Sequence, residues 1–275
     1  MKSVILFLLF FTIALTESSP VTKQSKVHTF SSPDYKRISS IPDYYQKENR
    51  FGTYPLNGSM HCGPVAVSNS LIWLSKNGVS SLVPSSGNDL LDQHNIIEKL
   101  ASKEYMNTRS IGSTVQDLCR GLKKYLDEKG VDGLLFFEGM YTVSDKFSGD
   151  SLPDLDQIIK YTKGLRAAWL NIGWYRYDPD TNEYRKTGGH WVTLSGYKNE
   201  NSSDILIIND PATKEWQMEY LNIEPIIDGT IINGNKNFAV NASGFFRFKT
   251  GKNRYGIIGG VVYLSLENEE ILAGV

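Results

Sequence analysis

Apolar residues in the first part of the chain recur at helical spacing. After Cys62-Gly63-Pro64, apolar side chains follow one another at near-helical intervals up to Gly78. Pro64 suits the first turn of a helix, because the N–H that proline lacks has no intrahelical partner there, and Gly78 is typical of a helix end. Three further stretches with this pattern predict helices over residues 88–104, 113–128 and 153–163.

From residue 166 onward the pattern favours strands. Apolar, β-branched and aromatic residues form runs over residues 166–174, 190–197, 204–209, 244–248 and 257–266. Turn residues separate these runs, and Asp210-Pro211 closes the third. Helices followed by antiparallel strands are typical of an α+β domain with a helical layer on one side of a sheet. No linker follows residue 50, so we expect one domain over residues 51–275.

The N-terminus has the pattern of a signal peptide. Lys2 supplies a positive charge, and residues 4–15 form an almost unbroken apolar run before polarity returns. A run of about a dozen residues is shorter than the roughly 20 that a membrane-spanning helix needs, although an uncleaved anchor is the alternative. We therefore expect a signal peptide over residues 1–18 and a flexible lead-in or short pro-segment over residues 19–50. The mature protein is then secreted or periplasmic, with no membrane contact after cleavage.

Composition limits the chemistry. The 275 residues are 40% hydrophobic and 21% charged, which is typical of a globular protein and argues against disorder, collagen or a coiled coil. Lys and Arg number 29 and Asp and Glu 30, with no basic stripe, so nucleic acid is not an expected partner. Two cysteines and four histidines exclude a disulfide-dense scaffold and a multi-cysteine zinc module. No metal or organic cofactor is expected.

Three short segments hold the residue types of a thiol hydrolase: Cys62 at a helix start, His190 after Gly188-Gly189 at a strand start, and Asp210 after the next strand. A helix N-terminus lowers the pKa of a cysteine and offers backbone N–H groups to an oxyanion. His190 is placed to pair with the thiolate and to protonate a leaving amine. Because adjacent antiparallel strands bring their ends together, Asp210 is placed to orient the imidazole.

The order of these motifs resembles that of papain-like cysteine peptidases, most closely the double-glycine leader peptidase group and its secreted relatives. The matching motifs are the Cys-Gly-Pro helix start, the histidine before an aliphatic strand with Gly196-Tyr197, and Asn209-Asp210-Pro211. The resemblance covers roughly residues 50–215. It implies a helical layer packed on an antiparallel sheet and hydrolysis of a peptide or protein substrate through a thioester acyl-enzyme. In that scheme Cys62 is the nucleophile, His190 the general acid/base and Asp210 the orienting residue.

One departure from the family concerns the oxyanion. The family usually has a glutamine six residues before the cysteine, where this chain has Leu56. Asn57 carries the nearest amide and is the candidate substitute donor. The departure motivates an alternative function, a secreted binding protein on the same scaffold with little or no turnover. A second alternative is acyl transfer of the transglutaminase kind, because the same triad serves both reactions and the acceptor decides.

Each site residue also has a structural interpretation. Two cysteines in an exported chain favour a disulfide between Cys62 and Cys119, although Cys119 lies on an apolar helical face that indicates a buried thiol. His190 alternatively bonds a backbone carbonyl at a strand end, and Asp210 alternatively caps a turn before proline. His61 is interpreted as a residue at the rim of the site.

Overall fold

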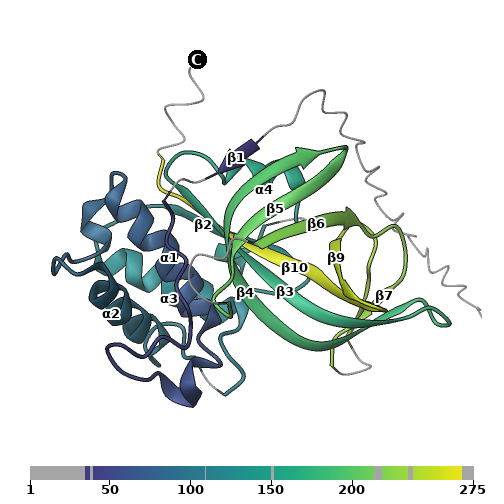
Figure 1. Cartoon of the computed structure of the whole chain (residues 1–275), viewed down its shortest axis with the longest axis horizontal. Helices are drawn as coiled ribbons and strands as arrows, with labels where there is room; N and C mark the ends of the chain where they lie inside the picture. The colour runs from purple at the N-terminus through teal and green to yellow at the C-terminus, as the bar shows by residue number, and fades with distance from the viewer. Residues whose placement is uncertain are drawn as a thin grey trace, which may run out of the picture.

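A computed structural model describes residues 35–37, 40–108, 110–149, 152–213, 219–234 and 238–267. The expected signal peptide, residues 1–18, lies outside these ranges. Within them the chain forms a group of helices packed against one side of a strongly curved sheet (Figure 1). The expected α+β class is confirmed, and the sheet is mixed but mostly antiparallel.

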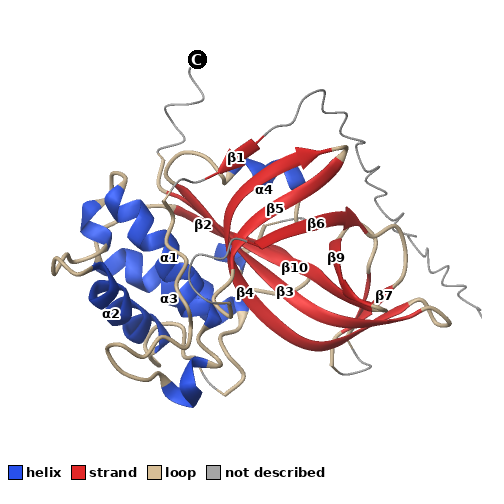
Figure 2. Cartoon of the chain, viewed as in Figure 1, coloured by secondary structure: helices blue, strands red, loops and turns tan. Residues whose placement is uncertain are grey.

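The four predicted helices are confirmed, with slightly shorter ends. Three of them form one group beside the sheet (Figure 2): α1 (Cys62–Lys76), α2 (Asp89–Ala101) and α3 (Val115–Glu128). The fourth, α4 (Leu155–Lys160), lies apart from the group. The side chains of Asn88, Thr114 and Asp154 cap α2, α3 and α4 by accepting hydrogen bonds from backbone N–H groups of the first turn. Three short 3₁₀ turns complete the helical segments: η1 (Pro55–Gly58), η2 (Ser80–Leu82) and η3 (Asp145–Phe147).

Ten strands of the described residues join in one sheet. They are β1 (Tyr35–Arg37), β2 (Leu134–Gly139), β3 (Arg166–Asp178), β4 (Glu183–Glu200), β5 (Ser203–Asn209), β6 (Glu219–Pro225), β7 (Thr230–Ile232), β8 (Ala239–Asn241), β9 (Phe246–Gly251) and β10 (Arg254–Ser265). Their order is β2-β10-β9-β6-β5-β4-β7-β8, while β1 pairs with β4 and β3 pairs with both β10 and β4. All pairs are antiparallel except β4 with β7.

The β3–β4 hairpin is longer than predicted, and this corrects the position of His190. The polar stretch between the predicted strands belongs to the hairpin, whose tip lies between Asp178 and Glu183. Residues 183–189 lie partly in solvent, except for the buried Tyr184, whereas all side chains from His190 to Tyr197 are buried. His190 is therefore an interior residue of β4 and not the first residue of a strand.

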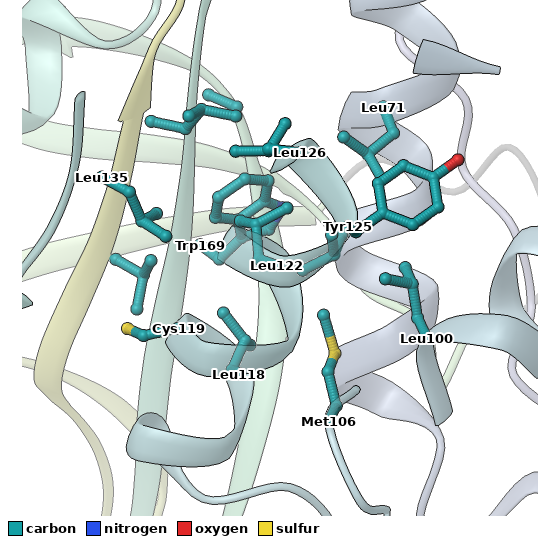
Figure 3. Close-up of a cluster of buried hydrophobic side chains, with 14 of the residues drawn as sticks. Leu71, Leu100, Met106, Leu118, Cys119, Leu122, Tyr125, Leu126, Leu135 and Trp169 are labelled. Atoms are coloured by element: carbon teal, nitrogen blue, oxygen red, sulfur yellow. The ribbon is translucent and has the colours of Figure 1, made fainter. Parts of the chain in front are cut away.

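Two hydrophobic clusters hold the layers together. One lies between the helices and the sheet and includes Leu71 of α1, Leu122 of α3 and Trp169 of β3 (Figure 3). The other includes Ile158 of α4 and Val192 of β4. Since β4 contributes to both clusters, through Trp191 to the first and Val192 to the second, its position is fixed from two sides.

The segment before α1 is packed onto the sheet. Ile41 and Gln46 are each only 5% exposed, and β1 pairs with β4. The Asn209 side chain donates to the carbonyl oxygens of Ile41 and Pro42, at 3.3 and 2.8 Å. The flexible lead-in predicted over residues 19–50 is therefore wrong from residue 41 onward, because this part buries apolar and amide side chains.

Candidate active site

One tryptophan and one threonine side chain fix the first turns of α1 against the sheet. Trp169 of β3 donates its indole N–H to the carbonyl oxygen of Ala66 at 3.0 Å, and the Thr193 hydroxyl of β4 donates to the same oxygen at 2.8 Å. Asn69 adds a bond from its amide to Thr193 Oγ1, at 3.3 Å. Because these bonds are buried, they hold the Cys62 end of α1 in one position relative to β4.

The second residue of α1, Gly63, lies close to β4 and to the segment before α3. A Cβ on Gly63 would lie 3.4 Å from the Trp191 ring and 3.6 Å from Ser113. Trp191 is itself held by a hydrogen bond from its indole N–H to the Ser113 carbonyl oxygen, at 3.0 Å. Glycine at this position thus lets the start of α1 pack closely against the residue next to His190.

His190 and Asp210 form a buried ion pair. His190 Nε2 lies 2.5 Å from Asp210 Oδ1, and the two side chains are 9% and 10% exposed. The β4–β5 register pairs Thr193 with Asn209, so the residue after Asn209 lies beside the part of β4 that carries His190. Asp210 Oδ1 also accepts a bond from the Ala212 backbone N–H, at 2.7 Å, which fixes the carboxylate.

The Cys62 thiol completes this group. Burial alone would lower the pKa of His190, but hydrogen bonds to Asp210 and to Cys62 outweigh it and raise that pKa to about 10. Since Nε2 faces Asp210, the other ring nitrogen, Nδ1, is left for Cys62. The structure therefore brings Cys62, His190 and Asp210 together, with an imidazolium favoured at neutral pH.

Trp174 covers the imidazole. Its ring stacks on His190 with centroids 6.3 Å apart and an interplanar angle of 25°. Gly188 lies against the same ring, since a Cβ there would lie 3.4 Å from Trp174 Cδ1. Cys62 is 9% exposed, so little water reaches the pair, whereas the backbone of Gly189 is open to solvent. An exposed stretch of backbone therefore lies directly next to the buried His190 in the sequence of β4.

None of the contacts among the described residues joins the Asn57 side chain to Cys62, His190 or Asp210. Leu56 and Asn57 lie in η1 with left-handed backbone angles, φ 54° and 50°, and both side chains are exposed. The Asn57 amide is thus solvated, whereas Cys62 and His190 are buried.

Gln46 is an amide near the site that the sequence interpretation missed. Its backbone N–H donates to the Pro211 carbonyl oxygen at 2.8 Å, and its side-chain Nε2 donates to the Ser59 carbonyl oxygen at 3.4 Å. The side chain is buried and its Oε1 has no hydrogen-bond partner in the described residues. Gln46 thus lies between the residues before Cys62 and those after Asp210. It lies upstream of the position that the family's six-residue spacing indicates, and no motif in the sequence marks it.

His61 is a buried residue, which corrects its interpretation as a rim residue. It is 3% exposed and stacks on Tyr54 at 5.0 Å, while the Tyr54 hydroxyl is hydrogen-bonded to His94 at 2.9 Å. Burial lowers the pKa of His61, and the charge of Glu98 only partly offsets this. The residue before Cys62 is therefore a neutral, packed imidazole at neutral pH.

The two cysteines are free thiols, so the Cys62–Cys119 disulfide is not formed in the structure. Cys119 is completely buried among apolar side chains of α3 and the sheet (Figure 3). Burial raises the pKa of the Cys119 thiol to about 12. Its chemistry therefore differs from that of Cys62, which is bonded to His190.

The described residues hold no group of three or more histidine, cysteine or acidic side chains arranged for a metal ion. They also hold no helix long and apolar enough to cross a membrane. No protein-family model matches this chain. The curated proteins contain no match to it either.

Proposed function

We propose that this protein is an exported, papain-like cysteine peptidase. The observation that carries the proposal is the buried His190 imidazole, hydrogen-bonded to Asp210 and to the Cys62 thiol at the start of α1. The elevated pKa of His190 supports a thiolate–imidazolium pair, which is the reactive state of a cysteine nucleophile. The apolar run at residues 4–15 supports export to a secreted or periplasmic location.

The proposed reaction begins with attack of the Cys62 thiolate on the carbonyl carbon of a peptide bond. The resulting oxyanion accepts hydrogen bonds from backbone N–H groups at the start of α1. The C–N bond then breaks as His190 gives its Nδ1 proton to the leaving amine, and a thioester remains on Cys62. Water, deprotonated by His190, hydrolyses the thioester and restores the free thiol. Asp210 keeps the imidazole oriented throughout.

Gln46 is the proposed side-chain donor to the oxyanion. One of its two amide N–H bonds is directed to Ser59, only three residues before Cys62, which leaves the other for a ligand. Its amide is buried beside the segment that leads into α1, whereas Asn57 is exposed. The function that the sequence resemblance assigns to a glutamine six residues before the cysteine is thus proposed for a glutamine farther upstream.

Cleavage of a peptide library by the wild type and by Cys62→Ala tests the proposal. We expect cleavage by the wild type and none by Cys62→Ala, while Cys119→Ala, the matched control, keeps the activity. Cleavage that persists in Cys62→Ala would refute the assignment of Cys62 as the nucleophile. Mass analysis of products formed with an added amine separates hydrolysis from acyl transfer.

Alkylation tests the activated thiol without any substrate. Iodoacetamide near pH 6 is expected to modify Cys62 much faster than Cys119, because only Cys62 is bonded to an imidazolium. Peptide mapping by mass spectrometry measures both rates. Equal, slow modification of both thiols would favour a binding protein that uses the same scaffold without turnover.

A further inference from the structure

A β-bulge brings a lysine to the side of β4 that faces α1. The β3–β4 pairing shifts between Trp174, opposite Gly188, and Tyr175, opposite Lys186, so one extra residue lies in β4. Such a bulge changes the face of the sheet onto which the preceding side chain projects. A Cβ on Gly189 would accordingly lie 3.8 Å from Cε and 3.9 Å from Nζ of Lys186. The ammonium group therefore lies above the exposed backbone next to His190.

Other residues on this side of β4 lie next to the start of α1, which carries Cys62. Residues 189 and 191 project to one side of a strand, and Trp191 is the side chain that packs against Gly63, the neighbour of Cys62. Because Gly189 has no side chain, nothing on β4 separates Lys186 from the backbone beside the catalytic pair. A substrate chain that reaches Cys62 over Gly189 therefore passes the Lys186 ammonium.

Lys186 is held in place by neutral groups. Its Nζ donates to the Tyr141 hydroxyl at 2.6 Å and lies 5.1 Å from the centre of the Tyr141 ring. Phe238 stacks parallel to that ring, with centroids 6.5 Å apart. No carboxylate of the described residues forms an ion pair with Lys186, whereas Arg185 and Lys198 of the same strand pair with glutamates. The half-buried ammonium thus keeps an uncompensated charge and further N–H donors.

We propose that Lys186, positioned by Tyr141, binds a carboxylate of the substrate beside the scissile bond, so that the enzyme selects acidic peptides. This inference rests on the proposed function and adds a substrate class to it. The carboxylate is that of an Asp or Glu side chain or of the peptide's C-terminus, since both present the same group to an ammonium. Gly189 leaves the space in which this group meets Lys186.

Matched peptides measure the selectivity. Each peptide is made with Glu or Gln at one position near the cleavage site and with an amidated C-terminus, and a further neutral peptide carries a free C-terminal carboxylate. We expect the wild type to prefer the Glu peptide over the Gln peptide about fivefold in kcat/KM, as for a partly exposed charge pair. Preference for the free C-terminus instead identifies the terminal carboxylate as the ligand.

Variants of Lys186 decide whether this lysine is responsible. Lys186→Gln is expected to abolish the preference for a carboxylate, and Lys186→Glu to reverse it towards a Lys-containing peptide. Lys163→Gln is the control, because Lys163 is an exposed lysine before β3 with no contact to the site among those described. An unchanged Glu-to-Gln ratio in Lys186→Gln would overturn the inference even where the wild type is an active peptidase.

A measurement without turnover separates this inference from the proposed function. The rate at which anionic iodoacetate modifies Cys62 is compared with that of neutral iodoacetamide, and binding of the Glu and Gln peptides to Cys62→Ala is measured. In Lys186→Gln the iodoacetate-to-iodoacetamide ratio is expected to fall about threefold, as for the loss of one screened nearby charge. If no peptide is cleaved but the iodoacetate-to-iodoacetamide ratio falls in Lys186→Gln, the proposed peptidase function is wrong and the anion site at Lys186 is supported. If the rate ratio and the peptide binding measured with Lys186→Gln equal those measured with Lys163→Gln, the anion site is overturned.

Discussion

At the scale of single residues, the site depends on how a few polar groups are satisfied. Asp210 accepts bonds from His190 and from the Ala212 backbone, so its position is set from two directions. Gln46, in contrast, is buried with its Oε1 unpartnered in the described residues. Since Oε1 is an acceptor, the donor proposed for the oxyanion is the second amide N–H of Gln46, the one that is not directed to the Ser59 carbonyl oxygen.

Gln46 and Asn57 are the two candidate side-chain donors to the oxyanion, and we expect their substitutions to affect kcat differently. We expect Gln46→Ala to lower kcat about 100-fold with little change in KM, as for the loss of one oxyanion donor. We expect Asn57→Ala to have little effect, because that side chain is exposed. Steady-state kinetics of both variants, with thermal unfolding to monitor folding, make the comparison. A large kcat loss in Asn57→Ala alone would restore the donor predicted from sequence.

The raised pKa of His190 predicts a pH-dependent stability. The imidazole has an ordinary pKa of 6.5 and a folded value of about 10, so folding favours its protonated form. The stabilisation is complete below about pH 6.5 and is lost as the pH rises towards 10. In urea unfolding, the stability advantage of the wild type over His190→Gln should therefore narrow across this range. A difference that stays constant from pH 6.5 to pH 10 contradicts the ion pair.

At the scale of elements, a glycine in η1, the turn before α1, allows this turn to pack against the segment that contains Gln46. Gly58 ends η1 with φ 70°, and a Cβ there would lie 1.8 Å from the Gln46 carbonyl oxygen. The Gly58 N–H bonds to Tyr54 and its carbonyl oxygen accepts from His61, the residue before Cys62. The position of Gln46 and the start of α1 are thus coupled through one turn.

Gly58→Ala is expected to disturb this coupling, with Gly87→Ala as its matched control. Both glycines have a positive φ, 70° and 84°, but a Cβ on Gly87 meets nothing within 4 Å. Gly87→Ala should cost only the backbone strain, about 1 kcal/mol. Gly58→Ala should cost more, because Gln46 must move, and should also lower kcat. Chemical unfolding and kinetics measure both effects, and equal losses in the two variants would argue against the coupling.

At the scale of the whole molecule, the sequence predicts those helices and strands whose apolar residues recur with a strong period. The helices after Cys62 and before Gly130 were found because their apolar stripes face one core. The pattern does not predict strands β1, β2, β6, β7 and β8. Of these, β1, β7 and β8 have three residues each, which are too few for a recognisable alternation. His190 and Asp210 are close in chain order, and the antiparallel register of β4 and β5 brings them together.

Contacts between distant segments leave no local pattern in the sequence. Gln46 reaches the site because residues 47–58 form a loop that returns to Cys62, and no periodic pattern marks such a loop. Likewise, the bulge that projects Lys186 towards Gly189 depends on pairing with β3. The site therefore combines motifs that are readable along the chain with supports that only the folded molecule brings together.

The packed segment before α1 predicts where the folded domain begins. A chain that starts at Tyr35 keeps β1, the buried Ile41 and Gln46, and the carbonyl groups that hold Asn209. A chain that starts at Phe51, the boundary expected from sequence, lacks these residues and therefore the contacts that they make beside Asp210. We expect the first chain to unfold cooperatively and to cleave peptides, and the second to have a Tm lower by at least several degrees and no measurable turnover, because buried polar groups are exposed or left unpaired. Calorimetry and the peptide assay on both chains measure this. Full activity of the shorter chain would show that residues 41–46 only cover the site and do not build it.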